Sequence, residues 1–186
     1  AEKICEWKPL RFVMCDNLHN TELPLGHILY EDYVKNQSAK APEIDFESHI
    51  YDEVLRLCTS GTTAMPKSVP VNDINEVLSA HEIIMSYPLN CKDVTLNMTP
   101  WFHRGGCHCG GPCPAFYVGA AVIVMRKFQP QNSLEWVNKY NVTFMVGAPA
   151  NLEMLCRSQL SNPKDISNLK GIEAMGAPLS KSDAER

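Results

Sequence analysis

The residues best suited to chemistry form one short stretch that combines hydroxyl groups, a glycine and a lysine. This stretch consists of Thr59, Ser60, Gly61, Thr62, Thr63, Ala64, Met65, Pro66 and Lys67. Hydroxyls and exposed backbone N–H groups donate hydrogen bonds to anionic oxygens, glycine lets the backbone approach a ligand closely, and lysine adds a mobile positive charge. The stretch therefore predicts a phosphate-binding loop, and the competing interpretation is a solvated surface turn.

Two common phosphate-binding motifs do not fit this stretch. A Walker A loop has a glycine, four residues and then Gly-Lys-Ser/Thr, whereas Gly61 is followed by Lys67 and Ser68 without the second glycine. The sequence also has no G-x-G-x-x-G after a predicted strand, the pattern that would indicate a dinucleotide site. A P-loop NTPase is therefore excluded as the interpretation of the loop.

Short apolar runs alternate with helical patterns along the chain. Strands are predicted at residues 11–15, 53–58, 94–98, 121–125, 142–146 and 171–175, and helices at residues 27–35, 73–87, 132–140 and 151–160. This alternation predicts an α/β fold, with a mainly parallel sheet and flanking helices. Ligands bind beyond the carboxyl ends of such strands. If strands 53–58 and 94–98 are parallel, the hydroxyl-rich loop and the turn at 99–106 lie on the same edge.

The helix after the loop has a predicted start, stop and buried face. Asp73 is the predicted N-cap with Glu76 three residues later, and Pro88 ends the helix. Its predicted inward face contains Ile74, Val77, Leu78, His81, Ile84 and Met85. Asn132 or Ser133 is expected to cap the next helix, and the apolar run at 121–125 predicts a strand covered on both faces.

Composition limits the class of protein and partner. The 186 residues are 45% hydrophobic, enough for a buried core, and 17 basic against 21 acidic residues give a net charge of −4. This balance argues against nucleic acid or an acidic membrane surface and favours a small-molecule partner. No apolar stretch has the length of a membrane span and the N-terminus has no signal-peptide pattern, so a cytoplasmic location is expected.

Most of the eight cysteines are scattered through apolar segments, which is typical of reduced, buried thiols. Three of them gather in the segment Cys107-His108-Cys109-Gly110-Gly111-Pro112-Cys113, which follows His103. These residues offer soft ligands for Zn²⁺, but the single residue between Cys107 and Cys109 suits a shared tetrahedron poorly. A small-residue turn is the favoured interpretation, and a zinc-bearing structural domain is the alternative.

Residues 59–67 resemble the phosphate-loop signature TSGTTG-x-PK of the adenylate-forming enzymes. These include acyl-CoA and aryl-CoA synthetases, nonribosomal-peptide adenylation domains and luciferases. Three more segments are similar to family motifs in the expected order, covering together about residues 53–180. They are Thr99-Pro100-Trp101-Phe102-His103-x-x-Gly106, the buried strand and turn at 142–149, and Gly176-Ala177-Pro178-Leu179.

The resemblance implies a two-step ligase that uses ATP, Mg²⁺ and coenzyme A. A carboxylate attacks the α-phosphate of ATP, and a thiol then accepts the acyl group from the acyl-adenylate. By the same resemblance, phosphate binding is assigned to Thr59, Ser60, Gly61, Thr62, Thr63 and Lys67. An acyl pocket is assigned to Trp101, Phe102, His103 and Gly106, adenine binding to Gly176, Ala177 and Pro178, and a catalytic role to His103 and Lys67.

Some family features differ or are not found in these residues. Ala64 stands where the family usually has glycine, and a Tyr-Gly-x-Thr-Glu segment, a ribose-binding aspartate and a C-terminal catalytic lysine would all follow Arg186. We therefore expect residues 1–186 to be part of an N-terminal AMP-binding domain, inactive alone and without the C-terminal domain. The alternatives are a noncatalytic nucleotide- or acyl-binding module, and an adenylation domain of the nonribosomal-peptide type.

Overall fold

The computed structural model describes residues 12–13, 23, 25–41, 43, 47–59, 66–125 and 127–185. The chain divides into two units, with the boundary along the sequence between residues 47 and 48. In the first unit, strand β1 (Phe12–Val13) pairs in parallel with β2 (Ile28–Leu29), and helix α1 (Tyr30–Val34) follows. The strand predicted at 11–15 is described only at its centre. The helix predicted to begin at residue 27 begins at Tyr30, since residues 28 and 29 pair as a strand.

The second unit contains a parallel four-stranded sheet with the strand order β6-β5-β7-β8. Its strands are β5 (Val94–Asn97), β6 (Ala121–Val124), β7 (Phe144–Gly147) and β8 (Gly171–Ala174). They coincide with four of the predicted strands to within two residues. The sheet and its flanking helices confirm the predicted α/β class.

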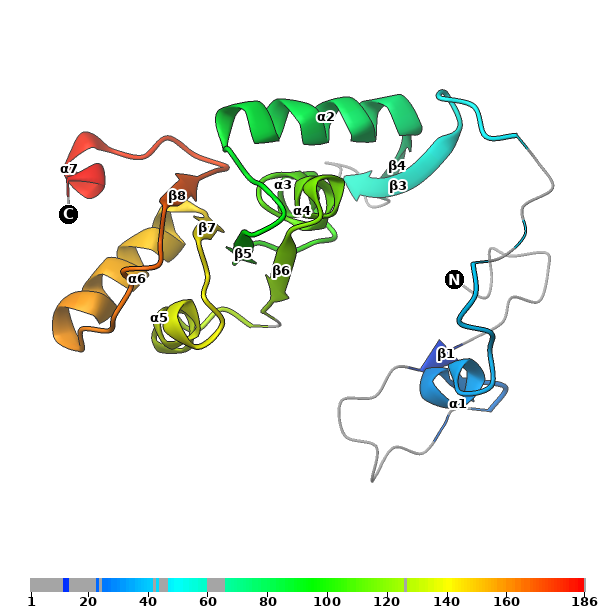
Figure 1. Cartoon of the computed structure of the whole chain (residues 1–186), viewed down its shortest axis with the longest axis horizontal. Coiled ribbons are helices and arrows are strands. Elements are labelled where there is room, and N and C mark those ends of the chain that lie inside the picture. The colour runs from blue at the N-terminus through cyan, green and yellow to red at the C-terminus, as the bar shows by residue number, and fades with distance from the viewer. Residues whose placement is uncertain are drawn as a thin grey trace. The chain divides into compact units, whose positions relative to one another are not determined.

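Helices cover this sheet on both faces (Figure 1). One face is covered by α2 (Asp73–Ser86), α3 (Arg104–His108) and α4 (Pro112–Val118), and the other by α5 (Pro130–Lys139) and α6 (Pro149–Ser161). Strand β7 is buried throughout and alternates between the two: Phe144 and Val146 pack in one cluster with Tyr87, and Met145 packs in the other. This two-residue period places the core on both sides of the strand.

The strand that leads into the hydroxyl-rich loop does not belong to the parallel sheet. β3 (Glu53–Thr59) pairs antiparallel with β4 (Lys67–Asn72), and the two form a separate two-stranded ribbon. The condition for a shared sheet edge, that strands 53–58 and 94–98 run parallel in one sheet, is therefore not met. The short connection between Thr59 and Lys67 favours the antiparallel pairing of β3 with β4, because a parallel pair needs a long crossover.

Helix α2 begins as a helix at Asp73, but Asn72 is its N-cap: the Asn72 side chain accepts a hydrogen bond from Asn75 N at 3.2 Å. The predicted capping box of Asp73 and Glu76 is wrong because Glu76 turns inward to partners on α3. The predicted inward face is also wrong in part. Val77, Leu78 and Met85 are exposed, whereas Ala80 is buried. The predicted end holds, since the helix stops at Ser86, before Pro88.

Other differences lie at element ends and edges. Helix α5 starts at Pro130 with Gln129 as N-cap, and Ser133 donates a hydrogen bond to Gln129 O at 2.9 Å from inside the helix. Strand β6 is an edge strand with Val124 57% exposed, so its expected coverage on both faces is wrong for the residues described. Ser180 caps the short helix α7 (Lys181–Ala184) by accepting a hydrogen bond from Asp183 N.

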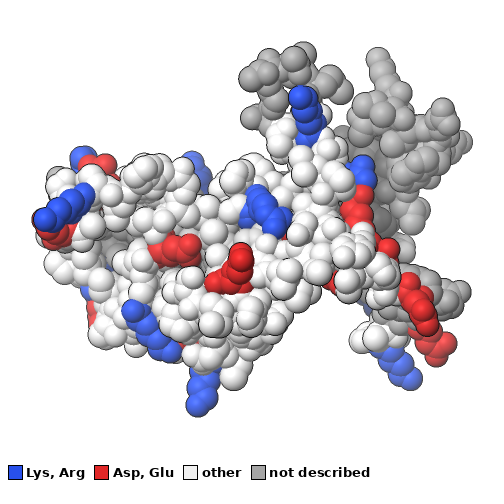
Figure 2. Space-filling model, turned by 90° about the horizontal axis from the view of Figure 1, so that it is seen from above, with Lys and Arg blue, Asp and Glu red and all other residues white. Residues whose placement is uncertain are grey.

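The surface and the helix lengths agree with the charge and hydropathy of the sequence. On the face drawn in Figure 2, basic and acidic side chains are interspersed over the second unit and do not form a patch of one sign. Among the helices described, none is both long enough and apolar enough to cross a bilayer.

Candidate active site

The turn that follows β5 is built around a buried asparagine. Asn97 Nδ2 donates hydrogen bonds to Gly106 O at 3.0 Å and to Cys109 O at 2.9 Å, and Asn97 Oδ1 accepts from Thr99 N at 2.8 Å. One amide thus joins the end of the strand, the turn and helix α3. Asn97 was not among the predicted site residues, and its only signal in the sequence is a polar side chain at the end of a predicted strand.

His103 stands at the start of α3 and caps it. Its Nδ1 accepts a hydrogen bond from Gly105 N at 3.1 Å. An acceptor at Nδ1 means that the proton of the neutral ring is on Nε2. The exposed ring therefore offers an Nε2–H donor to a ligand while its other nitrogen holds the helix.

Arg104 fixes the first turn of α3 to helix α2. Its guanidinium donates to Glu76 Oε1 at 3.0 Å and to Ser79 Oγ at 2.9 Å. The Glu76 side chain is only 15% exposed, so the pair is shielded from solvent on the acidic side. Neither residue was predicted for the site, because a contact between two helices that are far apart in the sequence produces no local spacing pattern.

The two ends of the hydroxyl-rich loop lie opposite each other at the end of the ribbon where β3 leads into the loop and β4 leaves it. Thr59 and Lys67 are register partners, and Thr59 Oγ1 donates to Lys67 O at 3.4 Å. Within the part of the chain that the structure describes, the Lys67 ammonium has no acidic partner. The remaining predicted phosphate-binding residues, Ser60, Gly61, Thr62 and Thr63, lie outside the described residues.

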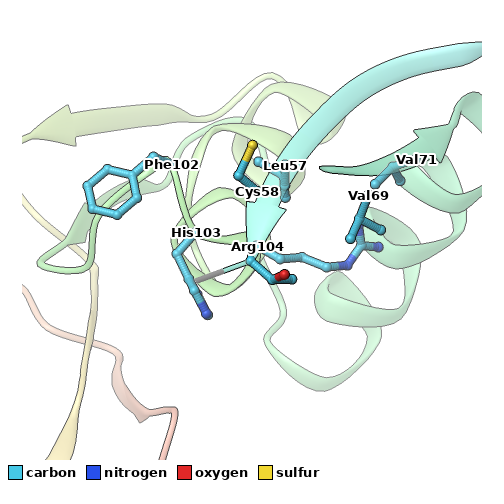
Figure 3. A pocket seen from close by; sticks show the side chains of 8 residues that line it. Leu57, Cys58, Val69, Val71, Phe102, His103 and Arg104 are labelled. Carbon is cyan, nitrogen blue, oxygen red and sulfur yellow. The ribbon is translucent and has the colours of Figure 1, made fainter. Parts of the chain in front are cut away.

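A cavity of about 420 Å³ lies between the ribbon and the start of α3 (Figure 3). Its lining comes from β3, β4 and the turn: Leu57, Cys58, Thr59, Val69, Val71, Phe102, His103 and Arg104. The wall is mainly apolar, with Thr59, His103 and Arg104 as its hydrogen-bonding groups. The structure thus brings together Thr59 of the loop segment and the Phe102-His103 motif, although their strands belong to different sheets.

The turn after β8 reaches the same region through a methionine. Thr99 Oγ1 lies 3.9 Å from Met175 Sδ, and a Cβ added to Gly105 would come within 2.1 Å of Met175 Cε. The next residue, Gly176, has φ +85°, a conformation that favours glycine, and Ala177 and Pro178 follow it in exposed positions. The predicted adenine-binding turn therefore begins beside the turn that carries His103.

The predicted acyl-pocket residues do not all occupy the same kind of position. Trp101 and Phe102 line a second cavity of about 430 Å³, whose wall also includes Val124 and Phe128. Gly106 lies inside α3 and lines neither cavity. A Cβ at Gly106 would come within 1.9 Å of Pro100 O, so glycine permits the close contact between helix and turn.

The three clustered cysteines do not share one ligand centre. Cys107 Sγ donates to Trp101 O at 2.7 Å, while Cys109 contacts Glu173 and Cys113 lies 3.6 Å from Glu76 Oε2. Burial raises the pKa of the Cys107 and Cys109 thiols, and burial together with the Glu76 charge raises the pKa of Cys113 to about 12. All three thiols are therefore protonated at neutral pH and poorly nucleophilic.

Most of the chain matches one known protein family. Residues 18–186 match the profile of the family described as AMP-binding enzyme. The chain belongs to the AMP-binding enzyme family. This match confirms the family resemblance seen in the sequence.

Curated relatives of this AMP-binding chain include two plant proteins. It is 28% identical over 178 residues to a 4-coumarate–CoA ligase-like protein of Arabidopsis thaliana, a match that covers 91% of the chain and 31% of the relative. It is 30% identical over 163 residues to 4-coumarate–CoA ligase 2 of Nicotiana tabacum, covering 85% and 29%. The chain therefore spans less than a third of the length of these relatives.

Among solved structures, an anthranilate CoA ligase in complex with anthranoyl-AMP superposes with a TM-score of 0.74 at 22% identity. The match covers 89% of the AMP-binding chain and 31% of that protein. This likeness establishes a common fold for the aligned part, in agreement with the parallel sheet and its flanking helices.

Proposed function

We propose that the chain provides the phosphate loop and part of the carboxylate-activating face of an AMP-forming ligase. In this reaction a carboxylate attacks the α-phosphate of ATP, pyrophosphate leaves, and the acyl group passes from AMP to coenzyme A. The observation that carries the proposal is the cavity in which Thr59 and His103 meet. Membership of the AMP-binding family and relatives named as CoA ligases support it.

The proposed role of His103 follows from its hydrogen bonds. Because Gly105 N holds Nδ1, the Nε2–H group is free to donate to an oxygen of the carboxylate or of the α-phosphate. A donor fixed before the reaction stabilises the negative charge of the transition state without reorganising. We assign the departing pyrophosphate to Lys67, Thr59 and the hydroxyls of residues 60–63, which have the donor chemistry that this charge requires.

The turn of Gly176, Ala177 and Pro178 is proposed to bind adenine. Its three residues are exposed after β8, and nothing lies within 4 Å of the Cβ position of Gly176. The contacts of Met175 with the Thr99 turn and Gly105 keep this surface close to His103. One nucleotide bound at the turn would then extend its phosphates toward the cavity.

Mg²⁺ is the expected partner of ATP, and the described lining does not form a protein site for it. Mg²⁺ requires oxygen ligands in octahedral geometry. The cavity wall offers the Thr59 hydroxyl and no carboxylate. We therefore assign no step to the ion, and we expect it to be carried in by the phosphate oxygens of ATP.

Nucleotide binding by the purified chain tests the proposal directly. We expect Lys67→Ala to weaken ATP binding about 10- to 100-fold, the value of one charge-assisted hydrogen bond. Lys92→Ala is the matched control, because Lys92 is exposed in the turn before β5, at the opposite end of the strand from the Thr99 turn, and should bind ATP as the unchanged chain does. Equal ATP affinity of both variants in isothermal titration calorimetry would contradict the assignment of Lys67.

We also propose that the 186 residues bind ATP but do not complete adenylation by themselves. The chain matches about 30% of the length of its relatives, and the expected ribose- and magnesium-binding segments are not among its residues. Carboxylate-dependent ATP–pyrophosphate exchange by the 186-residue chain would overturn this part. If a longer reading frame carries a Tyr-Gly-x-Thr-Glu segment, the longer protein should catalyse the exchange, whereas binding without exchange would favour a noncatalytic module.

A further inference from the structure

A group of three metal-binding side chains, one buried and two half-buried, lies where α2, α3 and α4 meet. Glu76 comes from α2, His108 from the end of α3 and Cys113 from the start of α4. One ligand atom from each lies within 4.8 Å of the other two. None of the three lines the cavity, so the group is separate from the proposed nucleotide site.

One ring nitrogen of His108 has no hydrogen-bond partner among the described residues. Its Nδ1 lies 3.0 Å from Arg104 O, and since a carbonyl only accepts, Nδ1 carries the proton. In the neutral ring Nε2 then presents a lone pair. This Nε2 lies 2.9 Å from Glu76 Oε2 but is not aligned for a hydrogen bond, and it has no other partner in the described part of the chain.

Nε2 and the carboxylate oxygen Oε2 of Glu76 thus lie 2.9 Å apart in a site where His108 is only 4% exposed. Two electron-rich atoms at this separation repel each other, and buried polar atoms normally have a partner. A divalent cation between them would convert the repulsion into two coordinate bonds. An additional proton on the ring is the competing explanation.

Of two separations between the ligand atoms, the O–S distance matches that around a small tetrahedral ion, and the N–O distance is about 0.4 Å shorter. With Zn–N, Zn–O and Zn–S bonds of about 2.0, 2.0 and 2.3 Å, tetrahedral ligands are separated by about 3.3 Å for N and O and about 3.5 Å for O and S. The structure has 2.9 Å between His108 Nε2 and Glu76 Oε2, and 3.6 Å between Glu76 Oε2 and Cys113 Sγ.

The surrounding contacts also match those of a metal centre. Ligating histidines usually donate their second ring N–H to a carbonyl or carboxylate, as His108 does to Arg104 O. Arg104 binds Glu76 Oε1 and leaves Oε2 facing the other two ligands. We propose that Glu76 Oε2, His108 Nε2 and Cys113 Sγ form a Zn²⁺ site with one open position, tying α2 to α3 and α4.

Binding of the ion would release the thiol proton of Cys113. The thiolate and the Glu76 carboxylate supply two negative charges that balance Zn²⁺, and neutral His108 supplies the third bond. This ligand set differs from the cysteines that cluster in the sequence, because Cys107 and Cys109 are engaged with Trp101 and Glu173.

Cobalt substitution tests the site, because a thiolate bound to Co²⁺ gives an intense near-ultraviolet charge-transfer band. We expect one equivalent of Co²⁺ to produce this band in the unchanged chain and one equivalent of Zn²⁺ to abolish it. Cys113→Ser should remove the band, and His108→Gln should weaken Zn²⁺ binding at least about 10-fold. Cys107→Ser is the matched control, since its hydroxyl can keep the bond to Trp101 O, and it should retain the band.

A second measurement on the unchanged chain covers the case of a variant that does not fold. One equivalent of Zn²⁺ should protect Cys113 from alkylation, as mapped by peptide mass spectrometry, and leave the reactivity of Cys107 unchanged. Absence of the band at one equivalent, its persistence in Cys113→Ser, or alkylation of Cys113 that does not respond to Zn²⁺ would each overturn the proposal. A protonated His108 would then account for the contact with Glu76.

Discussion

At the scale of single residues, the two ring nitrogens of His103 have two tasks, one structural and one proposed. Nδ1 holds the amino end of α3 through Gly105 N, while Nε2 remains free at the cavity. The helix cap therefore determines the tautomer that the proposed chemistry needs. Substitutions that separate the two tasks can show which of them the protein requires for activity.

His103→Asn separates them. Asparagine is a strong N-cap residue, so its side-chain oxygen can still accept from Gly105 N, and we expect the free energy of unfolding to change by less than about 0.5 kcal/mol. It has no group in place of Nε2–H, so pyrophosphate exchange by the proposed longer ligase should fall about 10²- to 10³-fold. Activity close to that of the unchanged enzyme would contradict the role of Nε2–H. Thermal unfolding and pyrophosphate exchange are the two measurements.

At the scale of elements, the position of α3 depends on a close contact between its backbone and the preceding turn. Asn97 binds the carbonyl groups of Gly106 and Cys109, and the missing side chain of Gly106 lets Pro100 O approach. The cavity wall formed by Phe102 and His103 is part of this turn. The geometry of the candidate site is therefore set by packing that does not itself touch the cavity.

Gly106→Ala tests this packing. The added Cβ would lie 1.9 Å from Pro100 O, a backbone atom that cannot move alone, so we expect a loss of about 1–3 kcal/mol in the free energy of unfolding. In Gly105→Ala the added carbon meets Met175 Cε, the end of a flexible side chain, and the change should be close to neutral. Equal effects of the two substitutions in urea unfolding would show that the turn does not constrain α3.

The strands and helices were predicted from the sequence more accurately than the contacts between them. The strand at 144–147 follows from a continuous apolar run, and the end of α2 follows from Pro88. The ribbon of β3 and β4 was missed because an apolar run does not reveal its pairing partner. Glu76 was assigned to a helix cap because its local spacing fits one, whereas its actual partner Arg104 is 28 residues away.

At the scale of the whole second unit, an ion pair joins the amino ends of two strands on the side away from the cavity. Asp93, directly before β5, accepts from Lys170 Nζ at 2.6 Å, and Lys170 directly precedes β8. Burial raises the pKa of Asp93, but the bonds from Lys170 and Asn90 outweigh burial and hold this pKa below its usual value. The pair spans β7, which lies between the two strands.

The stabilisation from Asp93 should depend on pH. Because its folded pKa lies below the unfolded value of about 3.9, the contribution is complete above that pH and is lost as the pH falls through the folded pKa. Lys170→Met should lower the free energy of unfolding at pH 7 by about 1–2 kcal/mol, less than for a fully buried pair because Lys170 is half-exposed. The deficit should shrink below about pH 4.

Lys164→Met is the control for this prediction. Lys164 pairs with the exposed Glu135 at 3.2 Å, and such pairs contribute about 0–1 kcal/mol. Urea unfolding of both variants across the pH range gives the comparison. A deficit in Lys170→Met that stays constant from pH 7 to pH 3 would rule out Asp93 as its origin.

The different neighbours of the two adjacent glycines carry a consequence for sequence variation within the family. Position 105 faces the tip of the Met175 side chain, so a larger residue there can be accommodated when position 175 becomes shorter, and the two positions should covary. Position 106 faces a main-chain oxygen, which every amino acid at position 100 would present. No substitution at position 100 can therefore compensate for a larger residue at position 106. An alignment of the family should show glycine at position 106 whatever residues occupy positions 100 and 105.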